Sequence, residues 1–302
     1  MAARTRIPPA PVADSGPSAW LRGWLGAALL WLVVSHALGA EALRIGLTPV
    51  FLDDQVTFLK DWQAYLEARL ERPVAFIQRT SYKEISDLLL RGELDFGWVC
   101  GFPYVRHRPA FRLVAVPVYE GAPRYRSYLI TGAGDRSIQG WEDLGGRYFA
   151  YSDPDSNSGY LYPRYAMAQQ GIDPARLLRG AFFAWGHRNV IEAVAVGLAD
   201  AGAVDGYVWD TLARDRPALT AATRVVHRSP EFGFPPLVAG LAPRVEERRR
   251  LAEVLEAMDG DDAGRRLLQA LNLDGFTAGD PALFDGIAHM MTQLEPPLDV
   301  AR

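Results

Sequence analysis

The sequence predicts an α/β protein with two lobes, each a sheet flanked by helices, and three observations favour this fold class. Apolar and amphipathic segments alternate from residue 42 to residue 100 in the order strand, helix, strand, helix, strand. A second α/β alternation starts near residue 131, and two extended stretches connect the two regions. Such an order predicts sheets with parallel strands. With 302 residues, 49% of them hydrophobic, the chain is long enough for two ordinary domains.

Residues 1–40 are expected to be a secretory signal peptide. Three arginines precede the apolar run from Gly23 to Val34, and Ala37-Leu38-Gly39-Ala40 follows it. A positive start, a short apolar middle and small residues at the end are typical of such signals, whereas a membrane span needs about 20 apolar residues. We expect cleavage after Gly39 or Ala40 and export to a bacterial periplasm. An uncleaved anchor or a core helix is the alternative.

Charge and cysteine content exclude some classes of partner. The first 40 residues hold three arginines and one aspartate, so the rest has 29 basic and 35 acidic residues and a net charge of −6. This balance disfavours nucleic acid or an anionic membrane as the partner, so an anionic ligand must be captured by local geometry. Cys100 is the single cysteine and cannot form an internal disulfide.

The first lobe is expected to begin at residue 41 and to run to residue 130. Ser81 and Glu84 have the spacing of a capping box, which places a helix start there. The expected order is a strand at 42–51, a helix at 53–70, a strand at 73–78, a helix that begins in the segment 81–94 and runs until Gly92, and a strand at 95–100. Ligands bind at the carboxyl ends of parallel strands, so the tips after Val50 and Val99 are candidate positions.

The second lobe is expected to cover residues 131–231. Extended stretches at 111–121 and 124–132 lead into it, and an extended return at 232–243 leads out. Helical patterns at 244–257, 261–270 and 280–294 follow with no strand expected between them, so they should pack on the first lobe. The first lobe therefore resumes over 232–295, and 296–302 forms a tail. Two crossings between lobes predict a cleft that can hinge.

A polar loop between a strand and a helix in the second lobe is the main candidate site. Ser152, Ser156, Asn157 and Ser158 precede Gly159, near which a tyrosine-rich helix begins. Open amides at a helix start, the positive end of the helix dipole and hydroxyls together suit a tetrahedral oxyanion. The alternative is a capped helix with a polar turn, and the residues alone leave both open.

Four further residues follow strands at positions that could face the cleft. His187 either donates to an oxyanion or caps its own helix, and Asp205 either accepts from a ligand or caps the helix 206–212. Cys100 and Tyr104 stand at the tip of the third strand. Cys100 is either a small buried apolar residue or, if exposed, a ligand for a soft metalloid.

Catalysis and metal binding are disfavoured by the same residues. A hydrolase would use Ser158 with His187, but the sequence has no G-x-S-x-G motif and no group evident to orient the histidine. The chain has five histidines and no His or Cys pair at metal-ligand spacing, so neither a metal site nor a cofactor is expected.

Four stretches together resemble the phosphate, phosphite and phosphonate binding proteins of ABC importers, which have the type 2 periplasmic binding fold. They are "YSDPDSNSGYLYPRY", "FPYV" after "LDFGWVC", the histidine of "WGHRNV", and "DAGAVDGYVWDTL", and the similarity runs over nearly all of residues 42–295. The resemblance implies two lobes that close on a ligand in the cleft between them, no catalysis, delivery to a permease in the inner membrane and a monomer.

The resemblance also implies a set of ligand-binding residues. Ser156, Asn157, Ser158 and the neighbouring Gly159 match the loop that holds the oxyanion, and His187, Asp205 and Tyr104 match further binding positions. Phe51 falls where the family often has an aromatic residue. Asn157 and Cys100 depart from the family pattern. One branch of the family resembles periplasmic arsenite sensors that signal to a membrane histidine kinase, so arsenite sensing through Cys100 is the alternative function.

Overall fold

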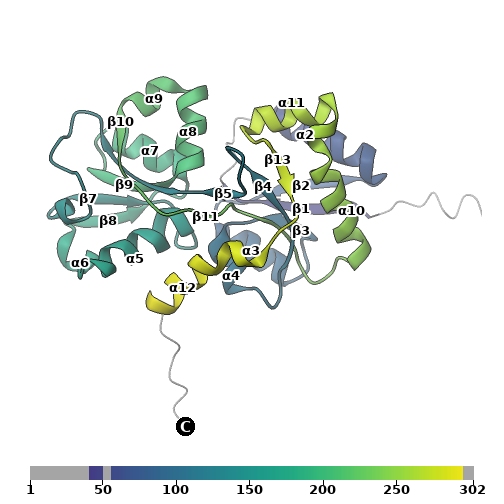
Figure 1. The fold of residues 1–302 in the computed structure, drawn as a ribbon, viewed down its shortest axis with the longest axis horizontal. Helices are drawn as coiled ribbons and strands as arrows, with labels where there is room; N and C mark the ends of the chain where they lie inside the picture. The colour runs from purple at the N-terminus through teal and green to yellow at the C-terminus, as the bar shows by residue number, and fades with distance from the viewer. Residues whose placement is uncertain (1–40, 50–55, 295–302) are drawn as a thin grey trace, which may run out of the picture. The chain divides into compact units, whose positions relative to one another are not determined.

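The computed structural model describes residues 41–49 and 56–294, and residues 42–294 belong to one compact unit. Two sheets organise this unit, and helices pack on each of them (Figure 1). No helix in the described ranges combines the length and apolar character that a membrane crossing needs. The fold is thus mixed α/β with two sheet-based lobes, as the sequence predicts.

The first sheet has six strands in the order β13-β4-β12-β3-β1-β2. Its strands are β1 (Leu43–Leu47), β2 (Val74–Gln78), β3 (Phe96–Trp98), β4 (Arg112–Val118), β12 (Leu237–Ala239) and β13 (Gly275–Thr277). β1 pairs in parallel with β2 and β3, which confirms the predicted start of the chain. β12 is antiparallel to both β3 and β4, so the return segment lies inside this sheet.

The first lobe carries the helices α2 (Val56–Leu70), α3 (Tyr82–Leu90), α4 (Gly101–Arg106), α10 (Val245–Glu256), η3 (Met258–Gly260), α11 (Asp262–Leu271), η4 (Pro281–Phe284) and α12 (Asp285–Leu294). α2, α3 and α10 pack on the strands of the first sheet. α12 packs on α4 of this lobe but also on α5 of the second lobe, so the expectation that the last helices pack on the first lobe holds only in part. The capping box predicted for Ser81 and Glu84 is present and starts α3. Trp62 of α2 is 1% exposed and contacts the rings of Phe76 and Trp98 from the sheet.

The second sheet has five strands in the order β10-β6-β9-β7-β8. Its strands are β6 (Ser127–Gly132), β7 (Tyr148–Tyr151), β8 (Gly180–Phe183), β9 (Ala201–Asp205) and β10 (Thr223–Arg228). β7 pairs in parallel with β8 and β9, so the three strands end at the same edge. The helices are η1 (Glu142–Leu144), the π-helical turn η2 (Asn157–Leu161), α5 (Tyr162–Gln169), α6 (Pro174–Leu177), α7 (His187–Ala195), α8 (Gly206–Asp215) and α9 (Pro217–Ala221).

A short two-stranded ribbon lies at the passages between the sheets. Its strands are β5 (Arg124–Tyr125) and β11 (Phe232–Gly233), which pair antiparallel (Figure 1). The ring of Tyr125 packs against Phe232 and Phe234 on the returning chain. Both crossings are therefore only a few residues long and are packed against each other.

Several short elements were not predicted from the sequence, and three of them, β13, β10 and α4, bear on the sheets and the site. The expectation that the last three helices have no strand between them is wrong, because β13 lies between α11 and α12 and pairs with β4. β10 extends the second sheet where no strand was expected, and α4 begins directly at the tip of the third strand. β6 belongs to the second sheet, so the chain changes sheets a few residues before 131.

Candidate functional site

The polar loop after β7 ends in a π-helical turn with a defined cap. Ser156 precedes η2, and its Oγ accepts the N–H of Gly159 at 2.9 Å. The N–H of Leu161 donates to the carbonyl of Ser156 at 3.0 Å, five residues back. π-helical turns are rare and occur often at functional sites. A β-carbon at Gly159 would lie 1.9 Å from Ser152 Oγ, so only glycine lets the turn pack this closely on Ser152, the residue after β7.

Hydroxyl and amide groups of this loop are buried. Ser152, Ser156, Asn157 and Ser158 are each at most 1% exposed. Within the described residues, Ser152 Oγ, Asn157 Oδ1 and Ser158 Oγ have no hydrogen-bond partner. A buried polar atom without a partner loses roughly 1–3 kcal/mol, so three of them in one loop indicate groups that are arranged to meet something else.

Two of the loop's amides are engaged, which differs from the open amides expected from the sequence. The N–H of Gly159 is used by the Ser156 cap, and the N–H of Asn157 donates to Cys100 Sγ at 3.3 Å. Cys100 is 3% exposed, and burial raises the pKa of its thiol to about 12. Cys100 is therefore buried and protonated at neutral pH, and it also contacts the candidate loop from the first lobe.

His187 connects three parts of the site. Its Nδ1 accepts the N–H of Asp205 at 3.0 Å, and its Nε2 lies 3.2 Å from the hydroxyl of Tyr82. Burial lowers the pKa of His187 to about 3, so the ring is neutral at pH 7. Because Nδ1 accepts, we assign the proton to Nε2, which faces Tyr82. His187 does not cap its own helix, because Gly186 occupies the cap position of α7.

Asp205 caps α8, as one of its two sequence interpretations predicts. Its Oδ1 accepts the N–H of Tyr207 at 2.9 Å. The residue is 2% exposed, and burial raises the pKa of its carboxyl to about 8. The carboxyl is therefore mostly protonated at neutral pH, and a protonated carboxyl can donate a hydrogen bond to an anion.

Three residues of this cluster were missed by the sequence analysis. Besides Tyr82, they are Tyr125, whose hydroxyl accepts from Asn157 Nδ2 at 2.9 Å, and Asp153, whose Oδ2 accepts the N–H of Tyr82 at 3.2 Å. Tyr82 begins α3 just after the carboxyl end of β2, which is the kind of position searched after β1 and β3. That signal was available, whereas nothing in the sequence pairs Tyr125 with Asn157.

Tyr104 and Phe51 are not placed in the cluster by any described contact. The ring of Tyr104 packs edge-on against Phe284 at 4.8 Å, and the guanidinium of Arg108 lies 5.7 Å from its centre. Phe51 lies outside the described residues. Beside the cluster, Arg106 of α4 forms an ion pair with Asp155 and lies 4.2 Å from the ring centre of Phe102. This pair joins the first lobe to the polar loop.

Apart from the carboxyl of Asp153, the cluster presents neutral hydrogen-bonding groups, and it carries no positive charge. It is formed by Tyr82, Cys100, Tyr125, Ser152, Asp153, Ser156, Asn157, Ser158, His187 and Asp205. Burial raises the pKa of Tyr82 and of Tyr125 well above the ordinary value, so both hydroxyls keep their protons. The set holds no lysine or arginine, and a small oxyanion is the ligand that such donors suit best.

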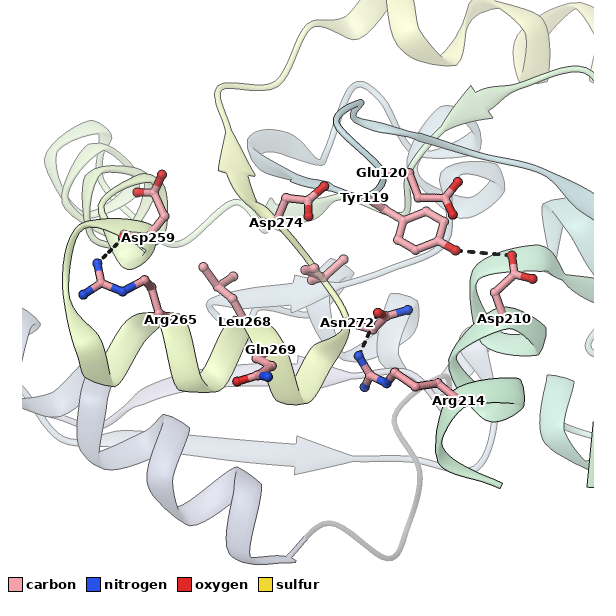
Figure 2. Close-up of a pocket in the computed structure, with 11 residues that line it drawn as sticks. Tyr119, Glu120, Asp210, Arg214, Asp259, Arg265, Leu268, Gln269, Asn272 and Asp274 are labelled. Atoms are coloured by element: carbon pink, nitrogen blue, oxygen red, sulfur yellow. Dashed lines mark hydrogen bonds between the residues drawn. The ribbon is translucent and has the colours of Figure 1, made fainter. Parts of the chain in front are cut away.

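A cavity of about 590 Å³ lies away from this cluster and is lined by none of the predicted site residues. Figure 2 shows its lining from α8, α11 and the segments beside them, with Tyr119 donating to Asp210 and Arg214 donating to Asn272. Its acidic residues Glu120, Asp210, Asp259 and Asp274 outnumber Arg214 and Arg265. The cavity is thus unsuited to an anion, and the site stays with the buried loop.

The chain matches known proteins over most of its described length. The family of the ABC transporter, phosphonate, periplasmic substrate-binding protein matches residues 45–284. The phosphate-import protein PhnD of Mycolicibacterium smegmatis is 30% identical over 158 residues, which are 49% of this chain and 48% of that protein. A probable ABC transporter phosphite binding protein, PhnD1 of Prochlorococcus marinus, is 29% identical over 97 residues, 32% of this chain and 33% of that protein. The matching segments thus span about half or less of these relatives.

Solved structures of the same fold agree with this match. A binding protein component of an ABC phosphonate transporter from Pseudomonas aeruginosa has a TM-score of 0.77 at 20% identity, over 83% of this chain and 86% of that one. PhnD1 from Prochlorococcus marinus, solved in complex with methylphosphonate, has a TM-score of 0.76 at 21% identity, over 84% and 98%. These structures share the two-lobed α/β architecture. Since the family match covers most of the sequence, this chain belongs to the periplasmic substrate-binding proteins of phosphonate ABC transporters.

Proposed function

We propose that this protein captures a small oxyanion, namely phosphonate, phosphite or phosphate, for an ABC importer. The observation that carries the proposal is the buried loop with three unpartnered polar atoms, Ser152 Oγ, Asn157 Oδ1 and Ser158 Oγ. Family membership supports the same function, since the similar proteins are named for phosphate import, phosphite binding and phosphonate transport.

The chemistry of the site would hold an anion through neutral donors. Ser158 and the protonated Asp205 can each donate a hydrogen bond to an oxygen of the ligand, as can the hydroxyls of Tyr82 and Tyr125. A hydrogen bond to a charged group contributes about 1.5–3 kcal/mol, so four or five of them hold a dianion without a lysine. His187 fixes the geometry by joining Tyr82 to the backbone of Asp205.

The proposed binding residues fall into two groups. The residues proposed to contact the ligand are Ser152, Asn157, Ser158, His187, Asp205, Tyr82 and Tyr125. Ser156 and Gly159 are proposed to hold the turn. Cys100 is proposed to border the site through Asn157. Phe51 and Tyr104 stay predictions from the first lobe, and Tyr104 packs against Phe284 here.

Location and partners follow from the same proposal. We propose that residues 1–40 direct export to the periplasm, that the mature protein acts as a monomer without catalysis, and that it delivers its ligand to a permease in the inner membrane. Because β6 belongs to the second sheet, we propose that the second lobe begins at Ser127 rather than at residue 131 and runs to residue 231, with the chain before it and the return from residue 232 forming the first lobe and the ribbon of β5 and β11 forming the hinge. The arsenite-sensing alternative has no supporting observation, because Cys100 is buried and protonated.

Calorimetric titration tests the proposal directly. The full chain is titrated with phosphate, phosphite and methylphosphonate, and binding of at least one of them is expected. The Ser158→Ala variant should bind that anion about tenfold or more weakly, because it loses one hydrogen bond to a charged group. Ser137→Ala, in an exposed loop, is the matched control and should bind as the original chain does. If none of the three anions gives a binding signal at millimolar concentration, the proposal is overturned.

A further inference from the structure

A second cavity, of about 380 Å³, lies against the same segments that carry the oxyanion site. Its walls include Tyr151 at the end of β7, Tyr160 of η2 and Phe183 at the end of β8, with Arg164 of α5 and Arg179 beside β8. We call it the aromatic-arginine cavity. Its volume falls within the range of small-molecule sites in proteins, about 300–1,000 Å³.

Three aromatic rings of this cavity form one packed cluster. Tyr160 meets both Tyr151 and Phe183 edge to face, with ring centres 5.2 Å apart in each pair. The rings of Tyr151 and Phe183 are tilted relative to each other, with centres 5.7 Å apart. Aromatic faces of this kind favour a flat apolar body as the ligand.

The two arginines of the cavity have no acidic partner. Within residues 41–49 and 56–294, neither Arg164 nor Arg179 forms an ion pair. The guanidinium of Arg164 lies 5.0 Å from the ring centre of Tyr160, and that of Arg179 lies 5.2 Å from the ring centre of Tyr148. Other arginines of this lobe are paired, such as Arg147 with Asp200 and Arg188 with Glu192. Unpaired guanidinium groups beside aromatic rings suit the planar anionic group of a ligand.

We propose that the aromatic-arginine cavity binds a small anion with a flat apolar body, of the class of aromatic carboxylates. The ring of such a ligand packs against Tyr160 and Phe183, and its carboxylate accepts hydrogen bonds from Arg164 and Arg179. This site is distinct from the oxyanion site, and its occupancy does not depend on the function proposed above.

The positions of the three rings also couple the two sites. Tyr151 directly precedes Ser152, Tyr160 directly follows Gly159 in η2, and Phe183 lies four residues before His187. A ligand in the cavity contacts Tyr160 of η2. It therefore stabilises the conformation of η2 described here, in which the polar side chains of the loop are buried. Occupancy therefore favours the geometry that binds the oxyanion, and by linkage the oxyanion favours the second ligand equally. This coupling rests on the proposed function.

Anthranilate, a fluorescent aromatic carboxylate, is the probe for the first part of the proposal. Titration of the full chain should show saturable binding, and anthranilamide and benzylamine, which lack the negative charge, should bind much more weakly. The double variant Arg164→Gln with Arg179→Gln should weaken anthranilate binding about tenfold or more, because two charge-assisted hydrogen bonds are lost. Arg176→Gln, an arginine of α6 whose side chain is 90% exposed and paired with Asp173, is the matched control.

The outcomes separate this site from the oxyanion site. Anthranilate binding that survives saturating phosphate and the Ser158→Ala change supports a second site, whereas displacement by phosphate overturns it. Absence of saturable binding at millimolar concentration, or equal binding by the double variant, also overturns it. If no oxyanion binds at all, the proposed function fails while the anthranilate titration still decides this proposal.

The coupling has its own measurement. With anthranilate at saturation, the dissociation constant of the bound oxyanion should fall about fivefold, which is the lower end of typical allosteric effects. The double variant should show no such change, because it no longer takes up anthranilate. An oxyanion affinity that is the same with and without bound anthranilate overturns the coupling.

Discussion

Asp205 donates its backbone N–H to Nδ1 of His187 at 3.0 Å, while both side chains are fully enclosed. The contact joins the end of β9 to the start of α7, and it fixes which nitrogen of the imidazole carries the proton. Burial also shifts the two pKa values in opposite directions, because it disfavours the charged form of each group. It raises the pKa of Asp205 to about 8 and lowers that of His187 to about 3. Their geometry and their charge state are therefore properties of one unit.

The first prediction concerns the pH dependence of stability. Because the pKa of Asp205 is raised in the folded protein, its contribution to the free energy of unfolding is largest below about pH 4. This contribution is progressively lost as the pH rises to about 8. The lowered pKa of His187 has the opposite sign, since its contribution is full above about pH 6.5 and is lost as the pH falls towards 3. The two slopes offset each other between about pH 4 and 6.5. From about pH 6.5 to 8 the free energy of unfolding should fall by up to about 1.4 kcal/mol per pH unit.

Denaturant unfolding of Asp205→Asn across this range measures the effect. Asparagine can still cap α8, so the variant should fold and show a flatter profile between about pH 6.5 and 8. Asp215→Asn, at the other end of α8, is the control and should keep the original slope. Equal slopes in all three proteins would show that Asp205 is not the titrating group.

The second prediction concerns Gly159. A methyl group there would lie 1.9 Å from Ser152 Oγ and 2.6 Å from Ser152 Cβ, so Gly159→Ala must push η2 and Ser152 apart. We expect a loss of about 1–3 kcal/mol in the free energy of unfolding, as for other overpacked sites, together with much weaker oxyanion binding. Gly134→Ala, where the added carbon meets nothing within 4 Å, is the control. A Gly159→Ala variant that is as stable as that control and binds the oxyanion as tightly would contradict the close packing of Gly159 on Ser152.

The third prediction uses Cys100 as a reporter of lobe opening. It is the only cysteine of the chain, its thiol has a raised pKa of about 12, and it contacts Asn157 across the two lobes. Alkylation by iodoacetamide at pH 8 should therefore be far slower than in the unfolded chain and slower still with a bound oxyanion. Labelling at the rate of the unfolded chain would show that the thiol is not enclosed.

The fourth prediction concerns the ion pair of Arg106 with Asp155, which joins the lobes at the protein surface. Pairs of this kind contribute up to about 1 kcal/mol, so Arg106→Gln should weaken oxyanion binding by no more than about fivefold. Combining it with Asp155→Asn in a double-mutant cycle isolates the pair, and the two effects should not add. Arg91→Gln, whose partner Glu93 lies in the same lobe, should leave binding unchanged. Fully additive effects would exclude this pair as a contact of the closed form.

Features of the fold that depend on residues close together in the sequence could be predicted, as two helices of the first lobe illustrate. The cap at Ser81 depends on residues only three positions apart, and the amphipathic pattern of 244–257 was sufficient for α10. By contrast, β13 has three residues, too few for an alternating pattern, and it exists because β4 offers it an edge. The helix α4 contains Pro103, which argues against a helix when the sequence is read alone.

The candidate site was predictable only where one segment supplies it. Ser156, Asn157 and Ser158 are neighbours in sequence, so their clustering was evident. Tyr82 reaches His187 over 105 positions, and no local pattern encodes that contact. Likewise the state of Cys100 depends on the burial that the closed lobes impose, which its own segment does not determine.

The strand order of the first sheet has a consequence for the synthesis of the protein. β12 lies between β3 and β4, although the chain makes it only after the whole second lobe. During synthesis from the N-terminus, β1, β2 and β3 are made first, and the edge of β3 stays unpaired until β12 has been made. The second sheet, by contrast, is formed by one continuous stretch, 127–228. The second lobe can therefore fold before the first sheet is complete. Until then the unpaired edge of β3 is the part of the nascent chain that most needs protection by a chaperone.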